Sequence, residues 1–279
     1  MAQIINTNVP SLNAQRNLNT SQGSLNNALQ RLSSGLRVNS SKDDAAGLAV
    51  AEKMNAQARG MVVASRNAND GLSLAQTAEA GMNVIGEHLQ RMRELAVQAA
   101  SGQYDSDNRS ALNTEFQQLK SEIDRVISAT NFNGQKLLNG TFSDGVTFQV
   151  GATTTGESRI NVVIAQISSI TGAVTDAAGA TGSAIGQVAL SAMSEIDAAI
   201  STLNTNRASL GAIQNRFEGV LNQLSAAHEN TEAARSRIMD ADYASETAKL
   251  ARSQVLQQAG VAMLSQANAL PQNVLSLLR

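Results

Sequence analysis

"AEAGMNVIGEHLQRMRELAVQAA", residues 78–100, carries the pattern that decides the fold of this chain. Its apolar residues recur in alternating steps of four and three, at Ala78, Met82, Ile85, Leu89, Met92, Ala96 and Ala99. This spacing puts these seven side chains on one stripe of an α-helix, and a seven-residue repeat is typical of helices that pack lengthwise. We therefore predict a long helix that buries one side against other helices.

The same repeat marks the N-terminal part of the chain, where Leu18, Leu25 and Leu32 are seven residues apart, with Leu29 and Leu36 on the adjoining row. A third helix is predicted from the spacing of Leu112, Phe116, Leu119, Ile123 and Val126. It follows the turn-prone segment "SGQYDSDN" at 101–108, in which Asp105 and Asp107 suit a helix N-terminus. We expect these three helices to be antiparallel.

Heptad spacing returns from about residue 188, at Ile196, Leu203, Leu210, Phe217 and Leu224. A final helix repeats Leu256, Met263, Leu270 and Leu277, and Pro271 should bend or interrupt it. We expect the first and last helices to pair as a two-stranded coil. The apolar stripes are too wide for one pairing, and the free end adds Val274, Leu275, Leu277 and Leu278. Further copies of the chain are the expected cover.

The middle of the chain has a different pattern. "VTFQVG" at 146–151 and "SRINVVI" at 158–164 are rich in β-forming residues and are joined by "ATTTGE". Val146, Phe148 and Val150 alternate with polar residues, so a small hairpin with one buried face is predicted. Residues 171–187 are rich in Gly, Ala and Thr, and we interpret them as a surface loop.

The predicted fold class is therefore mainly α, with long antiparallel heptad helices forming a coiled-coil rod and a small β-hairpin region. The composition agrees, because the chain has no Trp and only 3% aromatic residues, which suits closely packed helices. A net charge of −2 without basic runs argues against nucleic-acid binding. We find no apolar run long enough for a membrane span and no Sec-type signal at the N-terminus, so we expect no membrane insertion.

The sequence offers no convincing catalytic, cofactor or metal site. His88 and His228 are the only histidines, and neither has a second ligand at helical spacing. "DSDNRS" at 105–110 begins like a calcium loop but has Ser110 where glycine is needed. Asp43 and Asp44 could suggest paired catalytic carboxylates, yet they stand at the start of a long helix, where negative charge is favourable. We expect no enzyme activity and no cofactor.

Several stretches closely resemble bacterial flagellin and occur in the same order. They are "RLSSGLRVNSSKDDAAGLAVAEKM" (31–54), "RNANDGLSLAQTAEAGMNVI" (66–85), "QRMRELAVQAA" (90–100), "EIDRVISATNFNGQKLLNG" (122–140) and "PQNVLSLLR" (271–279). The resemblance covers roughly residues 1–165 and 188–279, which is nearly the whole chain.

The resemblance implies a structural subunit that self-assembles into the extracellular flagellar filament used for motility, secreted without a cleaved Sec signal. Residues 1–44 and 236–279 match the terminal coiled-coil segments that line the inner wall of such filaments. Residues 45–235 match the surrounding helical rod domain, with a β-hairpin at about 140–165 and a short variable loop at about 166–187. Asp43 and Asp44 would then mark the junction between the two layers. The terminal helices would carry assembly through Leu18, Leu25, Leu32, Leu256, Met263, Leu270, Val274, Leu275, Leu277 and Leu278.

The resemblance also implies partners. These are further copies of the chain, a flagellin export chaperone, and the filament cap and hook-junction proteins. In hosts they are Toll-like receptor 5 and cytosolic inflammasome sensors. The receptor-contact candidates are Gln90, Arg91, Leu95 and Glu115, and the sensors would read Leu275, Leu277 and Leu278. Leu95 lies outside the stripe of Met92 and Ala96, so we expect it to be exposed. An alternative is a flagellin-like cell-surface protein that captures a glycan.

Overall fold

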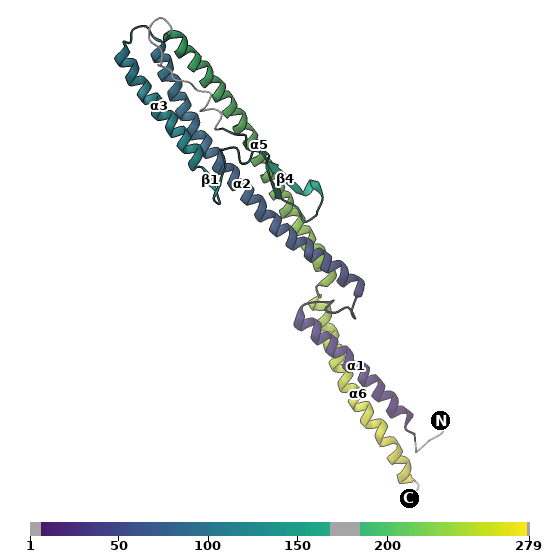
Figure 1. Ribbon diagram of the computed structural model, residues 1–279. Helices are drawn as coiled ribbons and strands as arrows, with labels where there is room; N and C mark the ends of the chain where they lie inside the picture. The colour runs from purple at the N-terminus through teal and green to yellow at the C-terminus, as the bar shows by residue number, and fades with distance from the viewer. Residues whose placement is uncertain (1–6, 168–184, 278–279) are drawn as a thin grey trace. The chain divides into compact units, whose positions relative to one another are not determined.

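The computed structural model describes residues 7–167 and 185–277, and the side chains of residues 7–167 and 188–269. The chain divides into two compact units. Met1–Gln57 and Glu229–Arg279 form what we call the terminal unit, and Ala58–His228 form the bundle unit. Long helices make up most of both units, together with two small antiparallel sheets, so the mainly α fold class is confirmed (Figure 1).

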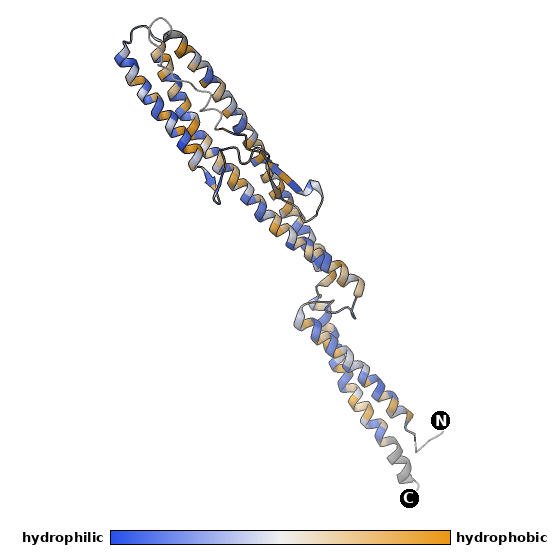
Figure 2. Ribbon diagram, in the orientation of Figure 1, coloured by the Kyte–Doolittle hydropathy of each residue, from blue (hydrophilic) through white to orange (hydrophobic). Residues whose placement is uncertain are grey.

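The bundle unit is built from α2 (Ala45–Ala100, from residue 58 onward), α3 (Ser106–Ala129) and α5 (Ile185–Met239, up to residue 228). Hydrophobic residues recur along all three helices (Figure 2). The predicted stripe of α2 is buried throughout, and no member from Ala78 to Ala99 exceeds 2% exposure. Ile196, Leu203, Leu210, Phe217 and Leu224 of α5 are buried too, and the first four share one core with this stripe, which confirms both predicted seams.

The start of α3 follows the local rule expected from the sequence. Asp105 is the N-cap residue, and its side chain accepts a hydrogen bond of 2.8 Å from the backbone N–H of Asn108. Asp107 lies in the first turn, where a carboxylate interacts favourably with the partial positive charge of the helix end. Phe116, Ile123, Val126 and Ile127 then face the core of the bundle.

The hairpin predicted in the middle of the chain is present. Strand β3 (Val146–Gln149) pairs antiparallel with β4 (Arg159–Val162), so that Val146 lies opposite Val162 and Phe148 opposite Ile160. A short 3-10 helix (Gly156–Ser158) and a second small hairpin, β1 (Asn131–Phe132) with β2 (Gln135–Lys136), accompany it. Ile160 and Val162 are buried in the core. The predicted surface loop at 171–187 lies almost wholly outside the described residues.

The terminal unit contains α1 (Val9–Ser34) and α6 (Tyr243–Leu277), which run antiparallel side by side (Figure 1). Pairing of the first and last helices is therefore confirmed. The expectation that the first helix joins the two helices at 78–99 and 112–126 is wrong, because α5 takes that place in the bundle. Pro271, predicted to bend or interrupt the final helix, does not interrupt it, since α6 continues to Leu277. Proline removes one backbone hydrogen bond, which a long helix can survive.

A backbone clasp fixes one end of the α1–α6 pair. Gly35, in the left-handed conformation with φ of 71°, ends α1 and donates its N–H to the carbonyl of Arg31. Arg37 N–H then donates to Met239 at 2.6 Å, and Ala241 N–H donates to Gly35 at 2.9 Å. These bonds surround a bridge between Leu36 and Asp240, so main-chain contacts join the two chain segments at one level, and the Arg37 guanidinium adds hydrogen bonds to the carbonyl of Ile238. None of the described helices has a stretch long and apolar enough to cross a membrane.

Candidate assembly surface

The side chains between α1 and α6 are mostly small or polar. Ser11 and Ala28 of α1 are buried there, as are Glu246, Ser253 and Ala267 of α6, all with exposures of 3–7%. Leu18, Leu25 and Leu32 are half-buried along the same line of α1. Gly260 allows the closest approach, because a methyl group on it would come within 3.2 Å of Leu18 Cδ1. The two helices therefore meet through a thin seam with little large apolar surface.

Polar contacts hold both ends of this seam. At one end, Asn8 Nδ2 donates to the carbonyl of Ala267 at 2.8 Å, and Ser11 Oγ donates to Asn268 Oδ1 at 2.7 Å. At the other end, the buried carboxylate of Glu246 lies 3.4 Å from Arg31 and 2.7 Å from Lys249. The hydrogen bond from Lys249, together with the positive charge of Arg31, lowers the pKa of Glu246 despite its burial.

The predicted seam of the final helix is wrong. Leu256 is 51% exposed and Met263 is 66% exposed, so this row lies outside the pair. The row that faces α1 is instead Glu246, Ser253, Gly260 and Ala267, which has the same seven-residue spacing. Both rows have seven-residue spacing, and the large apolar side chains of the Leu256 row led to its assignment as the seam. The missed signal is a heptad of small residues, which allows two helices to approach closely.

Large apolar side chains thus remain uncovered on the terminal unit. They are Val9, Leu12 and Leu29 on α1 and Val255, Leu256, Val261 and Met263 on α6, with exposures from 49% to 66%. This confirms that apolar surface remains after one pairing. Leu270, Val274, Leu275, Leu277 and Leu278 belong to the same prediction, but their side chains lie outside the described residues.

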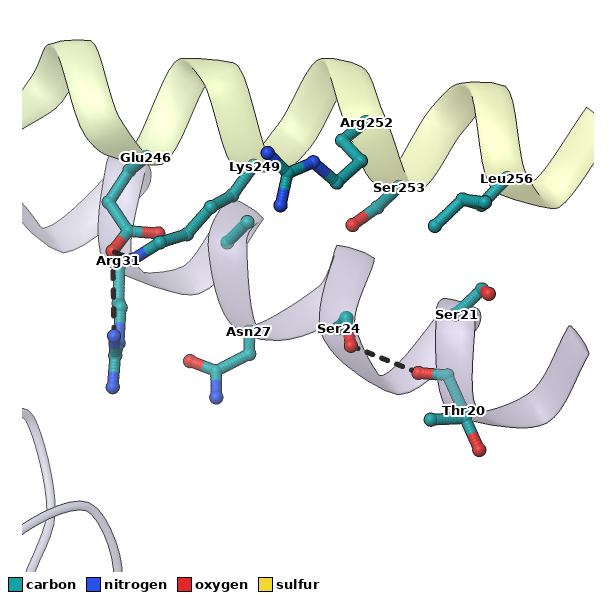
Figure 3. Close-up of a pocket in the computed structure, with 11 residues that line it drawn as sticks. Thr20, Ser21, Ser24, Asn27, Arg31, Glu246, Lys249, Arg252, Ser253 and Leu256 are labelled. Atoms are coloured by element: carbon teal, nitrogen blue, oxygen red, sulfur yellow. Dashed lines mark hydrogen bonds and ion pairs between the residues drawn. The ribbon is translucent and has the colours of Figure 1, made fainter. Parts of the chain in front are cut away.

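A continuous groove runs along one face of the α1–α6 pair. Its apolar half, about 610 Å³, is lined by Pro10, Ala14, Leu18, Leu256, Ala259 and Met263 among others. Its charged half, about 480 Å³, shares Thr20, Ser21 and Leu256 with the first and adds Arg31, Glu246, Lys249 and Arg252. Figure 3 shows these charged side chains of α6 lying above the serine, threonine and asparagine side chains of α1.

Asp43 and Asp44 act locally, as the helix-start interpretation requires. Asp44 Oδ1 accepts a hydrogen bond of 2.8 Å from the N–H of Gly47 in the first turn of α2. Asp43 Oδ2 accepts from the hydroxyl and the backbone N–H of Ser40, and these bonds lower the pKa of the Asp43 carboxyl. The two carboxylates therefore fix the turn that leads into α2.

The receptor-contact candidates lie where α2 meets α3. Arg91 bridges Glu94, at 2.9 Å, and Glu115 of α3, at 2.8 Å, and these hydrogen bonds raise the pKa of the Arg91 guanidinium. Gln90 is exposed beside them. The expectation that Leu95 is exposed is wrong, because it is only 1% exposed and belongs to the core. It lies one turn beyond Arg91 on α2.

Known proteins match the chain along its length. Residues 5–143 match the bacterial flagellin N-terminal helical region, and residues 193–278 match the C-terminal helical region. A flagellin of Halalkalibacterium halodurans is 46% identical over 281 residues, covering 99% of this chain and 100% of the relative. A flagellin of Bacillus subtilis is 38% identical over 302 residues, covering 99% of both.

Among solved structures, Bacillus cereus flagellin is 30% identical, with a TM-score of 0.49 over 57% of this chain and 88% of its own. The sequence matches reach almost from end to end, and the two matched regions include both α1 and α6. The chain belongs to the bacterial flagellin family.

Proposed function

We propose that this chain is a structural subunit of the bacterial flagellar filament and that it polymerises through its terminal unit. The observation that carries the proposal is the row of large apolar side chains left uncovered on α6, with Leu256 and Met263 at its centre. A monomer that leaves such side chains in water forgoes roughly 1 kcal/mol for each half-exposed group. Packing against neighbouring copies recovers this free energy, and its repetition yields a polymer.

In this proposal, the two ends of the chain and its middle form different layers of the filament. Residues 1–44 and 236–279 would line the inner wall, residues 45–235 would form the surrounding layer, and Asp43 and Asp44 would hold the turn between them. The family supports a location in the extracellular flagellum. An export chaperone, the filament cap and the hook-junction proteins are the other partners we propose on family grounds.

Seeded polymerisation followed by electron microscopy tests this function. Leu256→Asp and Met263→Asp each place a charge where apolar packing is proposed, and a buried unpaired charge is costly. We expect both variants to lose filaments. Gln118→Asp is the matched control, because Gln118 is also an exposed helical residue but lies on α3 of the bundle unit, outside the proposed assembly surface. Normal filaments from Leu256→Asp and Met263→Asp would contradict the proposal.

We also propose that the surface around Gln90, Arg91 and Glu115 is recognised by Toll-like receptor 5, and that the leucines near the C-terminus are read by cytosolic inflammasome sensors. In the filament, lateral packing would be the primary role of the Arg91 surface. The geometry that supports receptor contact is the exposed Arg91–Glu115 pair, with Leu95 supporting it from the core. A receptor reporter assay should show reduced potency for Arg91→Ala.

Arg125→Ala is the control for that assay, because Arg125 is likewise exposed and paired with a carboxylate, that of Glu122. Equal potency of Arg91→Ala and wild type would remove Arg91 from the proposed receptor surface.

A further inference from the structure

The charges of the terminal unit are separated along the chain. No Asp or Glu occurs in residues 1–42 or 247–279, while Arg16, Arg31, Arg37, Lys42, Lys249, Arg252 and Arg279 do. The carboxylates of the unit are confined to residues 43–52 and 229–246. Glu246 lines the groove, and we call the other seven the acidic belt: Asp43, Asp44, Glu52, Glu229, Glu232, Asp240 and Asp242. The belt outnumbers the cations within the same stretches, which are Arg235 and Arg237.

The charged half of the groove has an excess of positive charge. Arg31, Lys249 and Arg252 line it, and Glu246 is its only carboxylate. Glu246 is already shared between Arg31 and Lys249, whereas Arg252 is exposed and forms no ion pair within the described part of the chain. The Nε–H of Arg31 is also buried without a hydrogen-bond partner among the described residues. The groove therefore presents unused donors and positive charge to whatever binds there.

The acidic belt presents the opposite surface. Asp43, Asp44, Glu52, Glu229, Asp240 and Asp242 are all exposed. Asp242, at the start of α6, is ten residues from Arg252, which corresponds to about 15 Å along a helix. That separation is too long for a direct ion pair between these two residues, so Arg252 and the exposed carboxylates are available to another molecule, whereas Glu246 is already paired with Arg31 and Lys249 of its own copy.

We propose that the charged half of the groove binds the acidic belt of a second copy of this chain, and that this contact gives the polymer its head-to-tail direction. The inference rests on the proposed filament function and names the partner surface for one end of the subunit. Two different complementary patches on one chain form an open series, whereas a self-complementary patch would close as a dimer. The apolar half of the same groove, at Leu18, Leu256 and Met263, continues the contact and supplies most of its free energy.

Charge reversal with rescue tests this contact in the full-length chain. Arg252→Glu should raise the critical concentration for seeded polymerisation about three- to tenfold at about 20 mM sodium chloride, and less at about 500 mM, because the charges are screened. A belt variant combining Glu52→Lys with Glu229→Lys should act in the same direction, since both residues are exposed. Joining all three substitutions in one chain should return the critical concentration towards that of wild type.

Lys136→Glu is the matched control, because Lys136 is exposed on β2 of the bundle unit and the change in net charge is the same. Circular dichroism of each monomer should show unchanged helix content. The inference is overturned if Arg252→Glu polymerises like wild type at low salt, or if the combined chain polymerises no better than the belt variant. Failure of wild type to form filaments would instead overturn the proposed function.

Discussion

Gly71 lies where α2 comes closest to the ring of Phe217 on α5. A methyl group on Gly71 would stand 2.5 Å from Phe217 Cζ and 3.0 Å from Cε1, well inside van der Waals contact. Phe217 is fully buried and packs edge-on against Phe148, with ring centroids 5.8 Å apart. The ring cannot move away without disturbing the hairpin, so we predict that Gly71→Ala destabilises the bundle unit.

Two opposing effects set the magnitude. Overpacking of a core by one methyl group costs roughly 1–3 kcal/mol. Alanine in place of glycine inside a helix stabilises the folded state by up to about 1 kcal/mol, because it lowers the entropy of the unfolded chain and has the higher helix propensity. The expected net destabilisation is about 1–2 kcal/mol, which for a unit of this size lowers the melting temperature by about 2–8 °C.

Thermal unfolding of the monomer, followed by circular dichroism, is the assay. Gly211→Ala is the matched control, because Gly211 also lies inside α5 but has no atom within 4 Å of the added methyl group. We expect Gly211→Ala to raise the melting temperature by about 1–4 °C through the propensity effect alone. The opposite signs of the two identical substitutions separate packing from helix propensity.

A companion substitution shows whether the ring is the cause. Phe217→Leu alone should destabilise the core by leaving a cavity, but it should cost less when Gly71 is already alanine. If Gly71→Ala melts at or above the wild-type temperature while Gly211→Ala rises as expected, the close approach of α2 and α5 at this point is wrong.

Three further predictions concern local features. Asp105→Ala should destabilise the bundle unit by about 1 kcal/mol through loss of the α3 cap, measured by urea unfolding. Gly145→Ala should cost at least as much, because Gly145 has a φ of 84° and a methyl group there would collide with the side chain of Asn161, and it should shift the same unfolding curve. The hydrogen bond from Lys249 lowers the pKa of Glu246. The Glu246 carboxylate therefore stabilises the α1–α6 pair above its unfolded pKa of about 4.3, and this stabilisation is lost as the pH falls through the lowered folded pKa. Hydrogen exchange of α6 should accelerate below about pH 4 in wild type but depend less on pH in Glu246→Gln.

The bundle unit could be predicted from sequence because its apolar residues pack into a single core and serve no other contact. The stripe from Ala78 to Ala96 and the row from Ile196 to Phe217 are both buried in the same core, so periodicity and burial agree. The cap at Asp105 and the hairpin around Phe148 follow from short-range chemistry, which a single sequence contains in full.

The terminal unit was predicted less well because its apolar residues serve a different contact. On α6 the large side chains at Leu256 and Met263 lie outside the pair, and the seam is made by Ser253 and Gly260. A heptad pattern reports that a row is on one face but does not say which partner covers that face. Leu95 shows the converse, since the core buries a residue that lies outside the main stripe of α2.

The clasp between Leu36 and Asp240 determines how insertions would affect the packing of the two arms of the terminal unit, α1 and α6. In most helix pairs, large interlocking side chains must define the alignment, and substitutions there shift one helix along the other. Here the main-chain bonds around Leu36 and Asp240 fix the position of α1 relative to α6 at one end of the pair, and this position determines which residues of the two helices lie opposite each other. An insertion of seven residues in each arm would therefore lengthen the pair by about 10 Å without changing which faces meet. A one-residue insertion after Gly35 would leave α1 intact, whereas one before Arg31 would turn the whole outer part of that arm by about 100° relative to its partner.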